Sequence, residues 1–266
     1  MPVEPPANVL AAFGLTGRPV PLTGGQGGTW RVGGAVLKPL DAEPVESAWT
    51  AELFEAVPLD GFRVPRPRRA ADGSLHVAGW AAWEAVEGGH EPRWRDIIEV
   101  GEAFHAALAA VPRPAFLDTR TDRWSVADRV AWGERRLDGV HVKHLDRLRA
   151  ALGPVSARSQ LVHGDLTGNV LFAPGLPPAV IDFSPYWRPA GWASAVVVSD
   201  ALTWEGADES ILDGVTHVED FHQLLVRAVI YRVVTDRLFL ADEPLRPDDA
   251  DPYRPVVELV CRLARC

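Results

Sequence analysis

Residues 161–172, LVHGDLTGNVLF, and residues 179–184, AVIDFS, decide the fold of this chain. Each segment contains an apolar run that ends in polar residues, which is typical of a buried strand leading into a loop. The first run leads into Asp165, a tight turn carries Asn169, and the second run leads to Asp182. We therefore expect these three oxygen-bearing side chains at the ends of adjacent short strands.

Asp165, Asn169 and Asp182 together indicate a chemical function that none of the three indicates alone. Asp and Asn often only cap turns, and this is the simpler explanation for each residue alone. Phosphoryl transfer needs a carboxylate that orients and deprotonates an attacking hydroxyl, together with two oxygen ligands for Mg²⁺ on the phosphates. Asp165, Asn169 and Asp182 together meet this need, so the pattern favours phosphoryl transfer over turn capping.

A second candidate region precedes these segments in the chain. The loop GGQGG at residues 24–28 is followed by a predicted strand, Thr29–Val32, and the two-glycine hairpin signal Gly33-Gly34. The next predicted strand, Ala35–Leu40, contains Lys38. A glycine loop lets backbone N–H groups approach phosphate, and a lysine in the next strand can reach the same phosphates. Neither a P-loop nor a dinucleotide-binding fingerprint is present.

The pattern along the chain predicts an α+β protein with two lobes. The first 86 residues indicate a five-strand sheet with one main helix, which begins near Pro44. Its expected apolar stripe consists of Val45, Trp49, Leu53 and Val57. We expect residues 1–86 to form a small antiparallel β-rich N-terminal lobe that binds nucleotide.

Residues 87–266 are expected to form a larger, mainly helical C-terminal lobe with catalytic and acceptor-binding roles. Helical patterns cover residues 93–111, a segment starting near Ser125, a segment ending at 147–152, roughly 217–240 and 255–264, around a strand–loop–strand region at 160–183. Thr216 and Glu219 have the spacing of a capping box before the long helix.

Composition limits the possible partners and location. The formal net charge of −9 and the pI near 5.4 argue against a nucleic-acid-binding protein, which needs a basic face. No apolar run approaches the ~18–20 residues of a membrane span, and the N-terminus lacks the pattern of a signal peptide. Cys261 and Cys266 fit neither a disulfide framework nor a zinc site, so we expect a cytoplasmic protein.

Taken together, these motifs resemble the aminoglycoside phosphotransferase family, small-molecule kinases with the two-lobed fold of protein kinases. The resemblance covers nearly the whole chain in order, and the HGDLTGNVLF and IDF segments are its most specific parts. It implies ATP and Mg²⁺ as cofactors, Asp165 as catalytic base, and Asn169 and Asp182 as metal ligands. His163 and Asp200 would support the catalytic loop.

The resemblance also implies a set of nucleotide contacts. The ATP-binding residues would be Gly25, Gln26, Gly27, Gly28, Lys38, Glu46, Trp83, Ala85 and Val86. Within this set, Lys38 would contact the α- and β-phosphates and pair with a helix glutamate. Glu46 is the first candidate for this partner, with Glu52 and Glu55 as alternatives. Ala85 and Val86 would read the adenine edge through backbone groups.

The chain departs from the family pattern at two positions. The base and the asparagine are usually five positions apart in the family, whereas Asp165 and Asn169 are four apart. We expect Gly168 to absorb the difference through a left-handed backbone. Ser184 stands where a glycine often follows the Asp-Phe pair.

The acceptor is expected to be the hydroxyl of a sugar, amino sugar or aminoglycoside-like molecule. Its candidate contacts are Tyr186, Trp187, Trp204, Glu205 and Asp208, because aromatic faces stack on sugar rings and acids pair with ammonium groups. Core packing is the alternative explanation for the aromatic residues. The alternative function is a catalytically weak nucleotide-binding regulator. A protein kinase is disfavoured because the chain lacks a long activation segment. The pattern leaves the acceptor, the choice between ATP and GTP and the oligomeric state open.

Overall fold

The computed structural model describes residues 3–22, 28–40, 44–240 and 250–264. It confirms the α+β class, with a small unit built on an antiparallel sheet and a larger unit built mainly from helices. The compact units comprise residues 1–90 with 170–183, and 91–169 with 184–266. Unlike the division expected after residue 86, this one assigns the segment 170–183 to the N-terminal unit.

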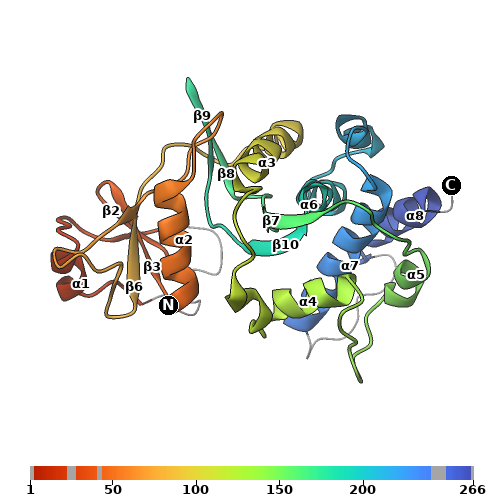
Figure 1. Cartoon of the computed structure of the whole chain (residues 1–266), viewed down its shortest axis with the longest axis horizontal. Helices are drawn as coiled ribbons and strands as arrows, with labels where there is room; N and C mark the ends of the chain where they lie inside the picture. The colour runs from red at the N-terminus through yellow and green to blue at the C-terminus, as the bar shows by residue number, and fades with distance from the viewer. Residues whose placement is uncertain (1–2, 23–27, 41–43, 241–249, 265–266) are drawn as a thin grey trace. The chain divides into compact units, whose positions relative to one another are not determined.

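The first unit contains an antiparallel sheet (Figure 1). Its described strands run in the order β1 (Val20–Pro21), β2 (Trp30–Val32), β3 (Ala35–Pro39), β6 (Trp80–Glu84) and β4 (Pro67–Arg68), and β5 (His76–Val77) also pairs with β6. Gly33 and Gly34 form the turn between β2 and β3, as the sequence predicts. The short strand β4 was not expected, because it lies in a proline-rich segment.

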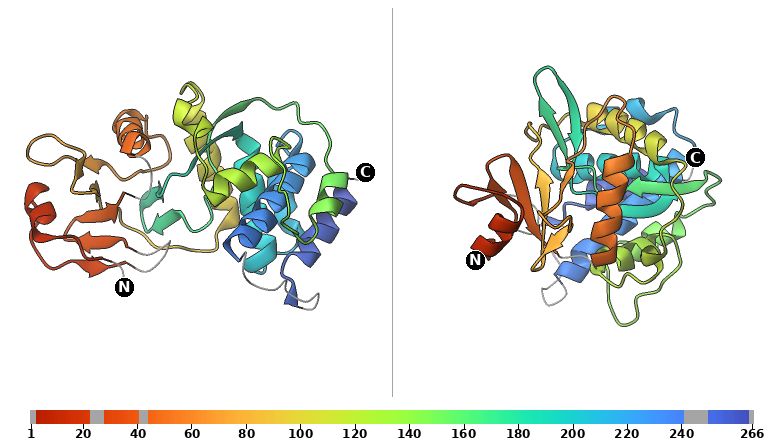
Figure 2. Two further views of the ribbon diagram at one scale, coloured as in Figure 1. Left: turned by 90° about the horizontal axis from the view of Figure 1, so that it is seen from below. Right: turned by 60° about the vertical axis from the view of Figure 1, so that its left-hand side comes forward.

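Helices and a hairpin complete the first unit. The helix α1 (Ala7–Ala12) contributes Val9 to an apolar cluster with the sheet residues Trp30 and Leu37. The helix α2 (Pro44–Ala56) lies beside the sheet, as Figures 1 and 2 show. The strands β8 (Val170–Ala173) and β9 (Leu176–Val180) form an antiparallel hairpin that is bridged to residues 63 and 89.

The expected apolar stripe of α2 is confirmed only in part, since Val57 is buried just after the helix and Trp49 and Leu53 are half-buried. Val45 is 62% exposed, whereas Ala51 and Phe54 are buried. A four-residue spacing drifts by about 40° per step around a helix of 3.6 residues per turn, so it does not define one narrow face. Contacts in the folded chain instead bury the side of the helix that carries Phe54. The ring of Phe54 packs against that of Trp83, with the ring centroids 6.1 Å apart.

The second unit is organised around two buried helices. The helix α6 (Ala190–Trp204) is buried from Trp192 to Ala201 and packs against α3 (Trp94–Leu108) and α7 (Phe221–Phe239). The other described helical segments are η1 (Ala115–Asp118), α4 (Arg123–Ala131), α5 (Leu145–Ala150), η2 (Glu209–Val215) and α8 (Arg254–Leu263). None of the helices in the described residues combines the length and apolar character that a membrane span requires.

The expected capping box at Thr216 and Glu219 is wrong. The helix α7 begins at Phe221, after Asp220 with φ +57°. The side chain of Asp220 accepts hydrogen bonds from the backbone N–H and hydroxyl of Ser156, and Glu219 accepts one from the same hydroxyl. Ser156, which is distant in the sequence, therefore binds the side chain of Glu219, which the local pattern predicts to cap the helix.

A strand was also missed in the second unit. The strand β10 (Pro185–Pro189) pairs antiparallel with β7 (Ser159–His163), and Pro185 lies opposite His163. Proline at both ends hides this strand from pattern analysis, because proline lacks the N–H of a ladder hydrogen bond. The pairing fixes residues 184–189 beside the strand that leads into Asp165.

Candidate functional site

His163 holds the loop that carries Asp165. The side chain of His163 is fully buried at the end of β7, and its Nδ1 accepts a hydrogen bond of 3.1 Å from the Asp165 backbone N–H. The His163 backbone N–H donates to Nε2 of His105 on α3, at 3.0 Å. These contacts anchor the Asp165 backbone to the core of the second unit.

The buried His105 makes this anchor sensitive to acid. Burial, followed by the neighbouring His163, lowers the pKa of His105 to about 3. In the unfolded chain the imidazole titrates near pH 6.5, so between about pH 6.5 and 3 the unfolded state binds the extra proton. We expect this group to reduce the free energy of unfolding by about 1.4 kcal/mol per pH unit as the pH falls through that range.

Urea unfolding of the wild type and of His105→Asn at pH 7.0 and pH 5.0 measures this dependence. We expect the variant to lose less stability than the wild type between the two pH values, because asparagine does not titrate there. Equal losses in the two proteins would show that His105 does not carry the proton linkage.

Gly164 occupies a position that has no room for a side chain. Its N–H donates to the carbonyl of Ser184 at 3.0 Å. A Cβ at Gly164 would overlap the ring of Tyr186 and lie 3.2 Å from the ring of Trp192. The aromatic rings of β10 and α6 therefore pack directly on the backbone beside Asp165.

We expect Gly164→Ala to destabilise the protein by about 1–3 kcal/mol, the usual cost of overpacking a core. Chemical denaturation of the purified variant measures the change. Gly133→Ala serves as a control for the loss of a glycine, since no atom lies within 4 Å of a Cβ there, although its φ of +72° adds backbone strain. A loss at Gly164 no larger than at Gly133 would contradict the packing argument.

Gly168 closes the short loop between Asp165 and Asn169. Its φ is +77°, as expected for a glycine that absorbs the missing residue. The Asn169 side chain then turns back, and its Nδ2 donates to the backbone carbonyl of Asp165 at 2.7 Å. A second contact of 3.3 Å joins Nδ2 to the Asp165 carboxylate. The four-residue spacing is thus compatible with a closed loop.

Arg232 is a site residue that the sequence analysis missed. It lies on α7, is 9% exposed, and donates from Nη2 to Oδ1 of Asp165 at 2.7 Å. The same guanidinium group binds both carboxylate oxygens of Asp200, at 2.7 and 2.5 Å. The signal available in the sequence was an arginine inside the apolar run AVIYRVV, which implies a buried anionic partner.

Electrostatics bind this triad together. Burial raises the pKa of the Asp200 carboxyl, and the neighbouring Arg232 opposes that shift. Burial by itself lowers the pKa of Arg232, but the carboxylates of Asp200 and Asp165 outweigh it and raise the pKa well above its usual value. Arg232 therefore remains a cation between the two acids.

Lys38 and Asp182 form an ion pair in the first unit. Lys38 lies on β3, as expected, and its ammonium contacts the Asp182 carboxylate. Asp182 has φ +50°, a left-handed conformation that is uncommon outside glycine and is concentrated at functional sites. The next residue, Phe183, packs against Phe54 of α2 with ring centroids 5.7 Å apart. The backbone at Asp182 is thus fixed by a neighbouring aromatic contact.

Of the remaining nucleotide-contact candidates, those that the structure describes also lie in the first unit. Glu46 is in the first turn of α2, as expected, and Glu55 forms an ion pair with Arg69. The pairing of Glu46 with Lys38 stays a prediction. Gly25, Gln26 and Gly27 lie outside the described residues, whereas Gly28 is described.

The residues expected to read the adenine edge, Ala85 and Val86, follow β6 directly. Trp83 packs edge-on against Phe54. The N–H of Glu84 donates to the carbonyl of Arg66, and the N–H of Ala85 donates to the carbonyl of Gly34. Because this N–H is engaged, a contact between Ala85 and adenine would use the carbonyl group of Ala85. The contact expected from Val86 stays a prediction.

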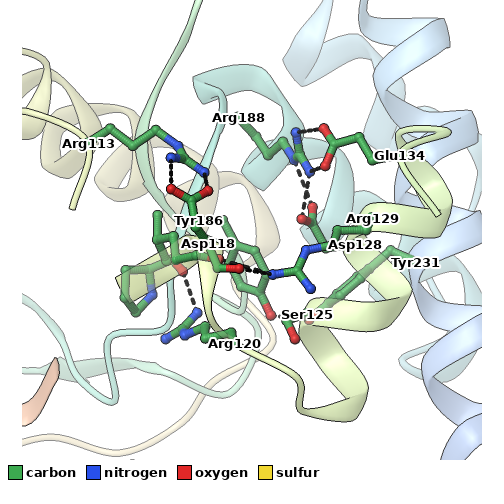
Figure 3. A network of polar contacts seen from close by, with 12 residues as sticks. Arg113, Asp118, Arg120, Ser125, Asp128, Arg129, Glu134, Tyr186, Arg188 and Tyr231 are labelled. Carbon is green, nitrogen blue, oxygen red and sulfur yellow. Dashed lines mark hydrogen bonds and ion pairs between the residues drawn. The ribbon is translucent and has the colours of Figure 1, made fainter. Parts of the chain in front are cut away.

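The candidate acceptor contacts separate into two places within the second unit. Tyr186 is 6% exposed, packs on Trp192 and Tyr231, and shares a hydrogen bond with the Tyr231 hydroxyl at 3.1 Å. Burial raises the pKa of Tyr186 well above its usual value. Figure 3 shows Tyr186 among the polar residues around α4. These contacts favour the packing explanation for Tyr186, whereas Trp187 on β10 is half-buried.

The other acceptor candidates lie at and after the end of α6. Trp204 packs edge-on against Tyr253, and Glu205 accepts a hydrogen bond from the indole N–H of Trp94. Asp208 accepts from the Ser210 N–H and lines a surface hollow of about 390 Å³ together with residues 92–96. Each of these side chains therefore has a structural partner.

Known proteins share this fold. The structure of a spectinomycin phosphotransferase in complex with ADP and spectinomycin has 12% identity and a TM-score of 0.62, with coverage of 97% of this chain and 96% of that one. Choline kinase LicA from Streptococcus pneumoniae has 11% identity and a TM-score of 0.59, with coverage of 96% and 97%. A thermostable mutant of an aminoglycoside phosphotransferase has 15% identity and a TM-score of 0.56, also with coverage of 96% and 97%. No curated protein sequence matches significantly.

These structures confirm the kinase-like fold that the resemblance implies. The model of one protein family matches residues 21–186, which include Lys38, the Asp165 loop and Asp182. The match covers more than half of the chain. This chain belongs to the phosphotransferase enzyme family.

Proposed function

We propose that the protein transfers the γ-phosphoryl group of ATP to a hydroxyl group of a small molecule, such as a sugar, an amino sugar or an aminoglycoside-like compound. The observation that carries the proposal is the fixed position of the Asp165 carboxylate after β7. His163 holds its backbone N–H, Asn169 holds its carbonyl and Arg232 holds one carboxylate oxygen. A carboxylate fixed in this way suits the orientation and deprotonation of an acceptor hydroxyl.

Asp165 acts as a general base in this proposal. The acceptor oxygen forms a bond to the γ-phosphorus, the bond from that phosphorus to the bridging oxygen breaks, and ADP leaves with the electron pair. The hydroxyl proton passes to the Asp165 carboxylate. The side chain is 38% exposed, so an acceptor can reach it.

Asn169 and Asp182 suit Mg²⁺ by the chemistry of their donor atoms. Nδ2 of Asn169 is engaged with Asp165, so the amide oxygen is the atom that would bind Mg²⁺. The Asp182 carboxylate already faces one cation, the ammonium group of Lys38. Bound Mg²⁺ would neutralise phosphate charge, and it usually completes its coordination with phosphate oxygens and water. In the described residues, His, Cys, Asp and Glu form no cluster of three or more that could hold a metal.

Chain connectivity supports a shared role for these two ligands. Val170 pairs with Val180 at one end of the β8–β9 hairpin. Asn169 directly precedes this pair, and Asp182 follows it by two residues. The metal-ligand candidates therefore flank the hairpin in the order of the chain.

Nucleotide binding in the first unit completes the proposal. Lys38 is assigned to the phosphates, the residues from Gly25 to Gly28 to a phosphate-covering loop, and Ala85 and Val86 to the adenine edge. The similar spectinomycin phosphotransferase structure contains ADP and spectinomycin, which supports a nucleotide and a small-molecule acceptor here.

Acceptor-dependent ADP release tests the proposal. Purified protein is incubated with Mg-ATP and a panel of sugars, amino sugars, aminoglycosides and choline. We expect at least one class to raise the rate of ADP release and to yield a phosphorylated product detectable by mass spectrometry. If Mg-ATP binds but no acceptor raises turnover, the proposal fails and the nucleotide-binding regulator becomes the better explanation.

A further inference from the structure

Arg232 connects the candidate base with a buried acid on a different helix. Its Nη2 donates to Oδ1 of Asp165 at 2.7 Å and to Oδ2 of Asp200 at 2.5 Å, and its Nε donates to Oδ1 of Asp200 at 2.7 Å. Asp200 is 3% exposed on α6, and Arg232 is 9% exposed on α7. Two hydrogen bonds to Asp200 therefore fix the planar guanidinium group in the orientation in which it also binds Asp165.

This arrangement distinguishes the two oxygens of the Asp165 carboxylate. Oδ1 accepts the short charge-assisted hydrogen bond from Arg232, whereas Oδ2 has a longer contact of 3.3 Å with Nδ2 of Asn169. The contacts at the two oxygens together restrain the rotation of the carboxylate. Oδ2 is then the oxygen better placed to receive the acceptor hydroxyl.

We propose that Arg232 is a positioning residue that fixes the Asp165 carboxylate for the acceptor, and that Asp200 acts on Asp165 through Arg232. The kinetic part of this inference rests on the proposed function. The structural part, which concerns the orientation of the carboxylate, does not. A positional error of about 1 Å can lower a reaction rate by about 10²-fold, so the orientation matters for catalysis.

The competing explanation is that Arg232 only compensates the buried charge of Asp200. The chain offers a matched control in Arg188, which binds Asp128 through Nε and Nη2 at 2.8 and 2.7 Å and also binds Glu134 (Figure 3). The side chains of Arg188 and Arg232 are 12% and 10% exposed. Both arginines therefore neutralise a buried aspartate in the same unit, but Arg232 also binds Asp165.

The experiment compares two paired variants, Arg232→Met/Asp200→Asn and Arg188→Met/Asp128→Asn. Each removes an arginine together with the charge of its buried aspartate, so no isolated buried charge remains. We expect comparable changes in melting temperature. For Arg232→Met/Asp200→Asn we expect kcat to fall by about 10²-fold with an unchanged KM for ATP, because the base is misplaced while the nucleotide contacts remain. The control pair should retain kcat within a few-fold of the wild type.

Crystal structures of both paired variants provide a readout that does not depend on activity. We expect the Asp165 carboxylate to rotate from its wild-type orientation in Arg232→Met/Asp200→Asn only. An unchanged carboxylate orientation, or an equal loss of kcat in both pairs, would overturn the proposal. If the wild type phosphorylates no acceptor, the proposed function fails, and the crystal structures still decide the role of Arg232.

A second variant applies if Arg232→Met/Asp200→Asn does not fold. Arg232→Lys keeps a buried cation, but a single ammonium group cannot reproduce the forked contacts to Asp165 and Asp200. We expect the same loss of kcat and the same rotation of the carboxylate in this variant. Wild-type kcat together with the wild-type carboxylate orientation would overturn the proposal.

Discussion

Replacing Asp165 by asparagine is expected to lower the turnover number by roughly 10²–10⁴-fold, the usual contribution of a positioned general base. The amide keeps the size of the side chain but cannot take up the proton of the acceptor hydroxyl. The affinity for Mg-ATP should change little, because Asp165 is assigned to the acceptor. ADP release measures turnover, and titration calorimetry measures nucleotide affinity.

Asp128→Asn is the matched control for this substitution. Asp128 also lies in the second unit and also accepts a hydrogen bond from an arginine, but its partner is Arg188. We expect the control to keep near-wild-type turnover while it loses some stability. Wild-type turnover in Asp165→Asn would remove Asp165 from its assigned role.

Asp182→Ala is expected to abolish the Mg²⁺-dependent part of nucleotide binding. A ligand that binds only the folded state raises the melting temperature according to its concentration and affinity. ATP should therefore stabilise the wild type more strongly with Mg²⁺ than without it. In Asp182→Ala the added effect of Mg²⁺ should disappear, because a carboxylate ligand to the metal is gone. Thermal unfolding with ATP, in the presence of either Mg²⁺ or EDTA, measures the stabilisation by ATP with and without the metal.

Asp72→Ala controls for the loss of a carboxylate in the same unit. Asp72 is exposed and accepts a hydrogen bond from the Ser74 N–H. Its response to Mg²⁺ and ATP should match the wild type. If Asp182→Ala responds to Mg²⁺ as strongly as the wild type, Asp182 is not a metal ligand.

Local chemistry explains why much of the fold was predictable. The hairpin at Gly33-Gly34, the strand with Lys38, the main helix from Pro44 and the helical character of the C-terminal part all follow from short-range patterns. The left-handed conformation of Gly168 was also predicted, because a loop shortened by one residue needs a backbone that glycine adopts readily.

Patterns that depend on distant partners were harder to interpret. The capping box at Thr216 and Glu219 fails because Ser156 engages the acidic side chains of Glu219 and Asp220. The strand β10 was missed because its stability comes from pairing with β7 and not from its own proline-rich sequence. In the first case the partner lies 63 and 64 positions away in the chain. In the second case the paired residues lie 22 to 30 positions apart. Both contacts outweigh the local preference.

The sequence by itself determined the family resemblance and the chemistry of the candidate residues, because residues 161–172 and 179–184 place carboxylates and an amide at strand ends within one short stretch. Only the tertiary structure decided which groups hold Asp165. Arg232 lies 67 positions from Asp165, and no periodicity in the sequence connects them. The folded core buries Arg232 beside Asp200. The ion pairs with Asp200 and Asp165 offset the free energy that burying the guanidinium charge costs. The physical reason is that an ion pair depends on distance in space, which the order of residues does not specify.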